Sequence, residues 1–505
     1  MSGFTIFLCI LVGIVTIVYI WLKRQLSYWQ KLGIPCEEPS LFTGNFIGLR
    51  TKYSLTELFV NYYNKFKGSG PFAGFYWFQN PVLIILDTQL IKNILIKDFN
   101  KFTDRGFYSN EKVDPLTGQL FLLDGQKWRS MRNKLSPTFT SGKMKFMFPT
   151  IIKVGEDFLN VLNELVDQNA KVDIKELLAR FTIDIIGTCA FGLNISSLRD
   201  PNTEFLVMGQ RGLVETRYGF FGTALTSTFP DLARKLHVKQ TPADIETFFL
   251  RIFRETVEYR EKNNIRRNDF MDLLIDLKNN KSLLSEDGET LTNLTVEQLA
   301  AQAFSFFSAG FESSSISMSF ALYALATHED IQDKVRKEIE TVFIAHGHEF
   351  IYDCLMDMKY LGQVILETLR LYTVVPVINR KCLEDYVVED NSKYVIKKGT
   401  SIFIPTAGIH LDEKYYPNPN VFNPDNFSSE RVNTRDHGEF LAFGEGPRNC
   451  IGFRFGLMQI KIGLALILKN YKVRVCSETQ VPLKFDKKAF FTKAEGSIIL
   501  KFERI

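Results

Sequence analysis

The chain has 505 residues, of which 45% are hydrophobic and 23% charged, the proportions of an ordinary globular protein with a sizeable core. Its 61 basic residues exceed its 57 acidic residues by only four, and they are dispersed, which argues against a nucleic-acid partner. The seven cysteines, at positions 9, 36, 189, 354, 382, 450 and 476, are odd in number and lack Cys-x-x-Cys spacing, so they indicate neither a disulfide framework nor a zinc site.

The N-terminus begins with 19 uncharged residues, Phe4 to Leu22, long enough to cross a bilayer as a helix. Lys23 and Arg24 follow directly, and the positive-inside rule keeps that end of the helix in the cytoplasm. A cleaved signal peptide is the alternative, but no positive residue precedes the apolar run and no Ala-x-Ala site follows it. We therefore predict a membrane anchor over residues 1–24.

The next segment, residues 25–45, contains Pro35 and Pro39 between Gly33 and Gly44, a composition that stops a helix. We predict a stiff Pro/Gly hinge there. Beyond it no Pro/Ser-rich linker, repeat or low-complexity run divides the chain, so residues 46–505 are expected to form one domain.

The domain is predicted to be mainly α with small β-sheets, an α+β fold. Residues 72–78 and 82–86 have the pattern of two short strands, and residues 384–405 and the last 35 alternate apolar and polar residues in short runs. The longest predicted helix runs from Thr295 to about Thr327, opened by a capping box of Thr295 and Gln298.

Polar residues interrupt this long helix at Ala309-Gly310-Phe311-Glu312-Ser313-Ser314. Gly310 costs about 1 kcal/mol relative to alanine, and Glu312 places a carboxylate among apolar neighbours, so a functional site is indicated. The alternative is a serine that bonds back to its own helix and a glutamate that reaches solvent.

A second unusual stretch runs from Phe443 to Gly452 and precedes a predicted helix that ends at about Asn470. Cys450 lies at the N-terminus of that helix, where the helix dipole favours an anionic sulfur able to ligate a metal. Arg448 offers a fork suited to a carboxylate. An inert, buried cysteine is the alternative.

The stretch resembles the haem-binding loop of the cytochrome P-450 family, Phe-x-x-Gly-x-Arg-x-Cys-x-Gly, and it matches every specified position, including Phe443. The resemblance implies the cytochrome P-450 fold with an N-terminal transmembrane anchor. It also implies haem b (iron protoporphyrin IX) as cofactor, with Cys450 as the axial ligand of the iron. The anchor, the polar break and the phenylalanine content look most like insect microsomal family 6 enzymes.

The same resemblance suggests roles for residues outside the loop. Trp128 and Arg132, four apart on one helix face, are similar to a family pair that binds a haem propionate. The further candidates for propionate contacts are Arg105, Arg380 and Arg448.

Glu312 and Ser313 resemble the family's acid and alcohol, which deliver protons to bound dioxygen. Serine replaces the usual threonine here and lacks the methyl group that restricts the rotamer. We therefore expect more peroxide to escape than with threonine.

Glu367 and Arg370 resemble the family's Glu-x-x-Arg pair, which locks the core beneath the haem. Asn426 stands where a third member, an arginine, is usual, and an amide cannot pair bidentately with Glu367. We expect Asn426→Arg to raise the melting temperature.

The predicted substrate pocket is assigned to Phe107, Phe307, Val375 and Phe490. Between residues 204 and 260, the stretches Tyr218–Gly222 and Ser227–Pro230 interrupt the helical pattern. By resemblance this region roofs the pocket and touches the membrane; a loop packed on the core is the alternative.

The implied function is a monooxygenase that inserts one atom of O2 into an apolar substrate, either foreign or an endogenous lipid-like compound. NADPH-derived electrons would arrive through a flavoprotein NADPH-cytochrome reductase, or cytochrome b5, docked on a basic face of Lys143, Lys145, Arg454 and Lys461. The expected location is the endoplasmic reticulum membrane, with a single-pass anchor and the catalytic domain on the cytoplasmic face. A haem-thiolate isomerase or dehydratase and a non-catalytic haem-binding protein remain as alternatives.

Overall fold

The computed structural model describes residues 3–267, 269–279, 294–389 and 394–505, and most of them lie in helices. The helices are α1 (Gly3–Gln25), α2 (Tyr28–Lys31), α3 (Leu55–Phe66), α4 (Thr88–Lys92), α5 (Gly125–Leu135), α6 (Ser141–Gln168), α7 (Ile174–Ile186), α8 (Glu204–Val214), α9 (Gly219–Thr228), α10 (Pro230–Lys235), α11 (Ala243–Lys262), α12 (Phe270–Lys278), α13 (Val296–Thr327), α14 (Glu329–Ala345), α15 (Tyr352–Asp357), α16 (Lys359–Leu371), α17 (Thr406–His410), α18 (Ser429–Thr434) and α19 (Phe453–Asn470). The strands are β1 (Phe72–Trp77), β2 (Asn80–Ile85), β3 (Lys171–Asp173), β4 (Ile378–Lys381), β5 (Tyr386–Val387), β6 (Val395–Ile396), β7 (Ser401–Ile404), β8 (Tyr471–Arg474) and β9 (Ile499–Arg504).

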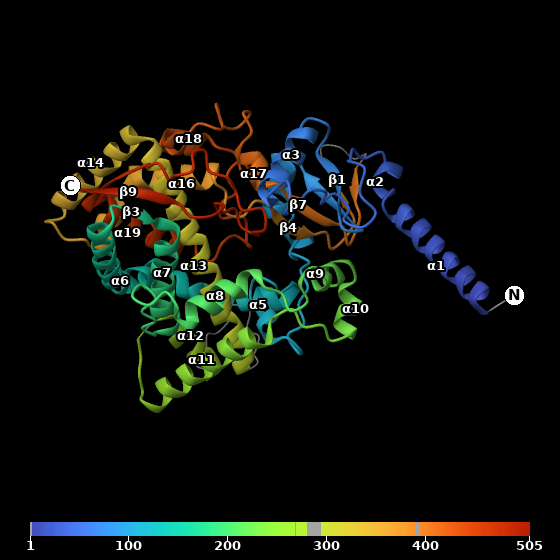
Figure 1. The fold of residues 1–505 in the computed structure, drawn as a ribbon, viewed down its shortest axis with the longest axis horizontal. Helices are drawn as coiled ribbons and strands as arrows, with labels where there is room; N and C mark the ends of the chain where they lie inside the picture. Colours follow the sequence, from blue (N-terminus) through green and yellow to red (C-terminus); the bar gives the residue numbers. More distant parts are fainter. Residues whose placement is uncertain (1–2, 268, 280–293, 390–393) are drawn as a thin grey trace.

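Helix α13 forms the axis of the larger, helical part of the molecule and packs against α7, α16 and α19 (Figure 1). The predicted capping box at its start is present, because Thr295 accepts from the backbone of Gln298 and Gln298 bonds back to Thr295. Gly310 makes room for α7 in the middle of the helix, since a Cβ atom there would lie 2.4 Å from Cδ1 of Ile186, and that side chain would have to move.

The smaller part of the molecule is built on a four-stranded sheet of order β1-β2-β7-β4, at the end from which α1 projects (Figure 1). Strands β1 and β2 form an antiparallel pair in which Phe72 faces Ile85, close to the two strands predicted from the sequence. Strand β2 is parallel to β7, and β7 is antiparallel to β4, which carries Arg380. This sheet has its own apolar core, separate from the core around α13.

Helix α1 has no residue buried by the rest of the protein, and its mean hydropathy of 2.7 suits a bilayer. The segment after it packs tightly on the sheet: Trp29 is buried, its indole N–H donates to the Phe75 carbonyl at 3.0 Å, and Gly74 lies flat beneath its ring. Residues 25–45 therefore include a rigid attachment to β1 as well as the Pro/Gly turns.

The two predicted interruptions between residues 204 and 260 are both present but shorter than predicted. The first stretch, Tyr218–Gly222, follows the end of α8 at Val214, but from Gly219 onward it belongs to α9. In the second stretch, Ser227 and Thr228 still belong to α9, the break lies at Phe229, and Pro230 opens α10.

Candidate haem site

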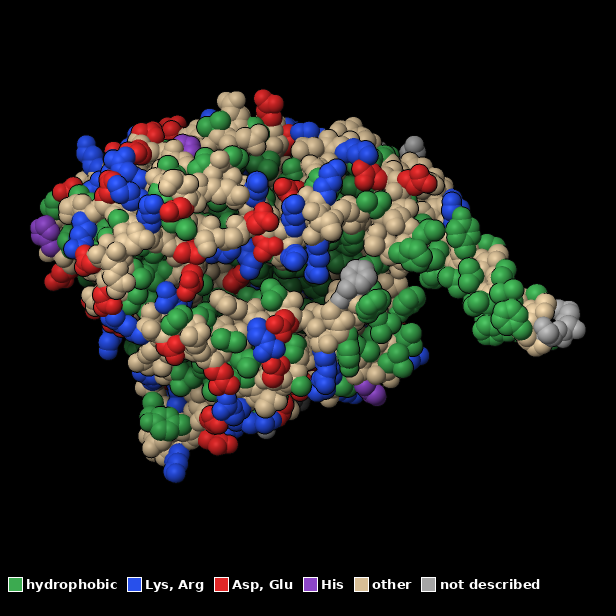
Figure 2. All heavy atoms as spheres, in the orientation of Figure 1, with side chains coloured by type: hydrophobic (Ala, Val, Ile, Leu, Met, Phe, Trp, Pro, Cys, Tyr) green, Lys and Arg blue, Asp and Glu red, His purple; other side chains and the backbone are tan. Residues whose placement is uncertain are grey.

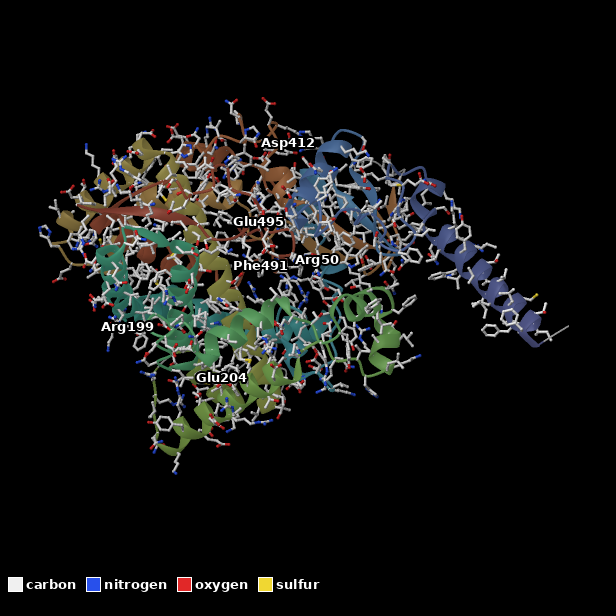
Figure 3. All side chains as sticks on the ribbon, viewed as in Figure 1. Arg50, Arg199, Glu204, Asp412, Phe491 and Glu495 are labelled. Atoms are coloured by element: carbon white, nitrogen blue, oxygen red, sulfur yellow. The ribbon has the colours of Figure 1, made fainter. Side chains whose placement is uncertain are left out.

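A cavity of about 510 Å³ lies beside the middle of α13. Its walls come from α5, α13, β4, the segment Leu441–Gly456 and the C-terminal segment near Phe491, which Figure 3 labels near the centre of the molecule. Residues that are far apart in the sequence thus meet around one space.

The stretch Phe443–Gly452, called the cysteine loop below, is held in a tight turn by its own backbone. The N–H of Cys450 donates to the Phe443 carbonyl at 2.7 Å. Gly444 and Gly446 have φ of 66° and 70°, and a Cβ at position 446 would collide with the Leu95 carbonyl. The positive φ favours glycine at both positions, and at position 446 no other residue fits.

Cys450 lies three residues before α19 and its side chain lines the cavity. Burial raises the pKa of its thiol, while the N–H of Gly452 and the charges of Arg132 and Arg105 lower the pKa. Binding of a metal ion displaces the proton of a thiol ligand.

Four arginines form a cluster at the edge of the cavity, here called the arginine cluster: Arg105, Arg132, Arg380 and Arg448. Arg132 donates to the backbone carbonyl and the side-chain oxygen of Asn449, at 2.9 and 2.7 Å, and so braces the cysteine loop. Arg448 lies over the ring of Trp128 at 4.3 Å and donates to the Leu123 carbonyl.

The arginine cluster has more positive charge than the protein balances. Burial and the neighbouring Arg448 lower the pKa of Arg380 to about 9, and burial lowers the pKa of Arg448 to about 10. Nε of Arg380 and both Nε and Nη1 of Arg448 are buried without an acceptor in the part of the chain that the structure describes. Such donors call for a bound anion, so the cluster fits a group that carries carboxylates, as haem b does.

The side chains of the polar break in α13 face two different spaces. Ser313 lines the cavity, and its hydroxyl donates to the Ala309 carbonyl at 2.7 Å. Glu312 lines a second, polar cleft of about 440 Å³ and forms an ion pair with Lys493 at 3.1 Å. The expectation of a carboxylate among apolar neighbours is therefore wrong, because the C-terminal segment supplies a cation.

Three of the four predicted pocket residues, Phe107, Val375 and Phe490, line the cavity. Phe307 does not, because it lies on the opposite face of α13 and packs on Phe205 in the core.

Sequence reasoning also missed Ser308, a cavity-lining residue whose buried hydroxyl has no partner among the described residues. Its position directly before the polar break, which begins at Ala309, could have indicated that it lines the cavity.

A layer formed by Glu367, Arg370 and Asn426, here called the Glu367 layer, lies outside the cavity. Glu367 and Arg370 pair bidentately, with both N–O distances 2.7 Å and no exposed surface. Asn426 donates to both Glu367 oxygens at 3.2 and 3.3 Å and accepts from Arg431 at 2.7 Å. Arg431 thus brings to the layer the second cation that Asn426 does not supply.

Comparison with known proteins agrees with this geometry. Residues 34–502 match the family Cytochrome P-450. The chain is 57% identical to cytochrome P-450 6a9 of Drosophila melanogaster over 505 residues, which are all of both chains. It is 48% identical to cytochrome P-450 6a2 of the same species, over 98% of this chain and 99% of that one, and 46% identical to cytochrome P-450 6A1 of Musca domestica, over 99% and 98%.

The fold, the thiol in its glycine-rich loop and the arginine cluster define a haem-thiolate oxidoreductase, mainly helical with small sheets. The chain belongs to the cytochrome P-450 family, and its relatives carry the family 6 name. It is accordingly a monooxygenase with haem b as cofactor, and in this family NADPH supplies electrons through a reductase.

Proposed function

We propose that the protein oxidises apolar small molecules at the cytoplasmic face of the endoplasmic reticulum membrane, using NADPH-derived electrons from a flavoprotein reductase or cytochrome b5. One observation carries the proposal: Cys450, the arginine cluster and Ser313 line a single cavity whose remaining walls are largely apolar. The protein would thus hold a haem on one side and an apolar substrate on the other.

Each residue that lines the haem side of the cavity has a proposed role. Cys450 would ligate the haem iron, and the haem propionates would be held by Arg105, Arg132, Arg380, Arg448 and Trp128. Haem ligated by a thiolate supplies the iron at which dioxygen is activated and one oxygen atom is transferred. The apolar walls exclude bulk water from the substrate, which limits unproductive loss of reduced oxygen.

Proton delivery is assigned to Ser313, with Glu312 supplying the proton from the polar cleft. The Ser313 hydroxyl faces the cavity while its hydrogen is shared with the Ala309 carbonyl, so it can accept one proton and pass on another. Lys493 keeps Glu312 on the cleft side of α13, so the carboxylate must leave this ion pair to reach the cavity.

The looser hydroxyl of Ser313 gives a test of this assignment. Ser313→Thr should lower the peroxide released per NADPH consumed, because the methyl group of threonine restricts the rotamer of the hydroxyl. Ser313→Ala should raise the peroxide released, because the hydroxyl is lost. Equal release from wild type and Ser313→Thr would count against a role for this hydroxyl.

The substrate is expected to be mainly apolar with one polar group. Phe107, Val375 and Phe490 supply apolar walls, and Ser308 offers a buried hydroxyl that a substrate oxygen or nitrogen could pair with. This chemistry is shared by foreign compounds and by hormones or fatty acids.

Membrane attachment is supported by an apolar surface that continues from α1 onto α9 and α10 (Figure 2). Trp21 of α1 stacks on Phe229 at 6.4 Å between ring centroids, and Phe221 is 82% exposed. Exposed aromatic and aliphatic side chains on this scale favour the membrane-touching roof over a loop packed on the core. Residues 1–24 would span the bilayer.

The reductase is proposed to dock on the side of the cysteine loop. Lys145 and Arg454 are exposed there, and Lys143 is half-buried. Lys461 contributes less than predicted, because its ammonium donates to the Leu355 and Met358 carbonyls and burial lowers its pKa.

The decisive experiment compares the absorbance of the reduced protein with and without carbon monoxide. A strongly red-shifted Soret band is expected from wild type and from the control Cys476→Ser, but not from Cys450→Ser. Product formation that depends on NADPH and reductase then separates the monooxygenase from an isomerase, a dehydratase or a haem carrier. Absence of the band in folded, haem-loaded wild type would refute thiolate ligation.

A further inference from the structure

A buried histidine connects the Glu367 layer to the cysteine loop. His410, the last residue of α17, has no exposed surface and stacks on the ring of Phe440, with 5.2 Å between centroids. Its backbone carbonyl accepts from Arg370 at 2.8 Å, which ties it to the Glu367 layer. Its imidazole has a partner on each nitrogen.

The partners of the ring determine which nitrogen carries the proton. Nε2 lies 2.8 Å from the backbone nitrogen of Leu441, which can only donate, so Nε2 is an acceptor. Nδ1 lies 2.8 Å from the Thr373 hydroxyl, whose own hydrogen is directed to the Arg370 carbonyl at 2.9 Å. Nδ1 must then donate, and the imidazole is neutral and protonated on Nδ1.

The neighbouring charges agree with a neutral ring. Burial and the guanidinium groups of Arg370 and Arg435 lower the pKa of His410 to about 3, despite a backbone hydrogen bond that raises it. In the neutral ring Nε2 keeps its lone pair and can accept from the Leu441 N–H.

The Leu441 bond acts at the start of the cysteine loop. Leu441 lines the cavity, and its carbonyl accepts from the N–H of Gly444 at 2.9 Å. Two residues after Leu441, the Phe443 carbonyl receives the N–H of Cys450. His410 thus fixes the backbone at Leu441, and two further backbone hydrogen bonds connect this part of the chain to the N–H of Cys450.

The Thr373 bond acts on another wall of the same cavity. Thr373 immediately precedes Val374 and Val375, which line the cavity, and its carbonyl accepts from the hydroxyl of Thr492, next to the cavity residue Phe491. One imidazole therefore joins the cysteine loop to the segments that carry the apolar walls.

We propose that His410 is a positioning residue that fixes the cysteine loop through the Leu441 N–H and so keeps Cys450 bound to haem iron as a thiolate. The inference rests on the proposed function, because it requires that Cys450 ligates haem. It assigns to His410 no contact with substrate or cofactor.

Two substitutions separate the nitrogens of the ring. In His410→Gln the amide oxygen reaches as far as Nε2 and can accept from Leu441, whereas in His410→Asn the amide nitrogen replaces the Nδ1 donor and Leu441 is left unpaired. Thr373→Val is the matched control, since it removes the partner of Nδ1 and leaves the Leu441 bond intact.

The measurement is the rate at which the red-shifted Soret band of the reduced carbon monoxide complex is lost on mild warming, with melting temperatures recorded alongside. His410→Asn should lose the band roughly 10-fold faster than wild type, the size expected for one buried hydrogen bond. His410→Gln should restore most of the lifetime at a similar melting temperature. Equal rates for the two variants, or rates that follow melting temperature alone, would overturn the proposal.

If either variant fails to fold, hydrogen exchange of the wild-type holoprotein still tests the hydrogen bond between His410 and Leu441. The Leu441 amide should be protected as strongly as the amides of α16, and rapid exchange there would overturn the inference. Failure of thiolate ligation and failure of the role of His410 give different results. No red-shifted band in wild type refutes thiolate ligation itself, whereas a normal band that His410→Asn leaves equally stable refutes only the role of His410.

Discussion

The buried arginine of the Glu367 layer, Arg370, and the two fully buried arginines of the arginine cluster, Arg380 and Arg448, differ sharply in their hydrogen bonding. In the Glu367 layer, Arg370 donates to both oxygens of Glu367 and to the backbone carbonyls of His410 and Pro419. In the arginine cluster, Arg380 and Arg448 keep buried N–H groups without acceptors within the described ranges. The first group is complete without a ligand and the second is not.

This difference distinguishes arginines that stabilise the fold from arginines that bind a ligand. A buried charge that the protein itself pairs contributes to folding only as long as its partner remains. A buried charge without a protein partner costs folding free energy, and it is retained where a ligand supplies the opposite charge. Substitutions should therefore affect stability in one group and cofactor binding in the other.

The largest effect is expected from Arg370→Met, which leaves the carboxylate of Glu367 buried beside amide donors only. Removing one partner of a buried ion pair costs about 3–5 kcal/mol, so unfolding free energy should fall by that amount. Denaturant titration would measure it with and without haem. The control Arg199→Met breaks an exposed pair with Glu164 and should change stability little (Figure 3). A loss seen only with haem bound would contradict the assignment to folding.

Arg380→Met is expected to show the opposite pattern. The haem-free protein should be at least as stable as wild type, because a buried cation without a counter-charge is removed. Haem retention should weaken by about 10-fold or more, since hydrogen bonds to charged groups contribute roughly 1.5–3 kcal/mol. Haem transfer to an acceptor protein measures retention, and unchanged transfer would exclude a propionate contact for this residue.

Esterified haem tests the same comparison by changing the ligand and leaving the protein unchanged. Haem dimethyl ester lacks the two carboxylate charges, so wild type should retain it about 10-fold less well than haem b. The loss should be smaller in Arg380→Met, because the partner on the protein is already gone. Additive effects of the ester and the substitution would show that Arg380 does not contact a propionate.

The sequence predicted those parts of the site that depend on local backbone. The helix that follows the cysteine loop, the capping box at Thr295 and the pair of strands from Phe72 follow from periodicity and capping patterns, which short stretches encode. The haem ligand was assigned instead from a resemblance, because a stretch of ten residues matches the haem-binding loop of the family at every specified position.

Side-chain facing and long-range partners could not be predicted in the same way. Phe307 and Ser308 are neighbours on α13, and only the packing of α8 and α11 decides which one turns to the cavity. Lys493 and Glu312 are separated by 181 residues, so nothing near Glu312 in the chain indicated its ion pair. His410 escaped notice because both of its ring partners come from distant segments.

Asn426→Arg is expected to have the smallest effect, and in the direction opposite to that inferred from the sequence. The amide oxygen of Asn426 accepts from Arg431, and the Glu367 oxygens already accept from Arg370 and the Asn423 N–H. An added guanidinium could take over the bonds of Asn426 to Glu367, but Arg431 would lose its acceptor and would lie beside a second cation. The larger side chain would also overpack the layer, which costs about 1–3 kcal/mol. The melting temperature of the haem-loaded protein should therefore fall. Asn426→Arg combined with Arg431→Gln should recover much of the loss, because the second guanidinium is removed. A rise in the single variant would show that the Glu367 layer, like the arginine cluster, is incompletely satisfied.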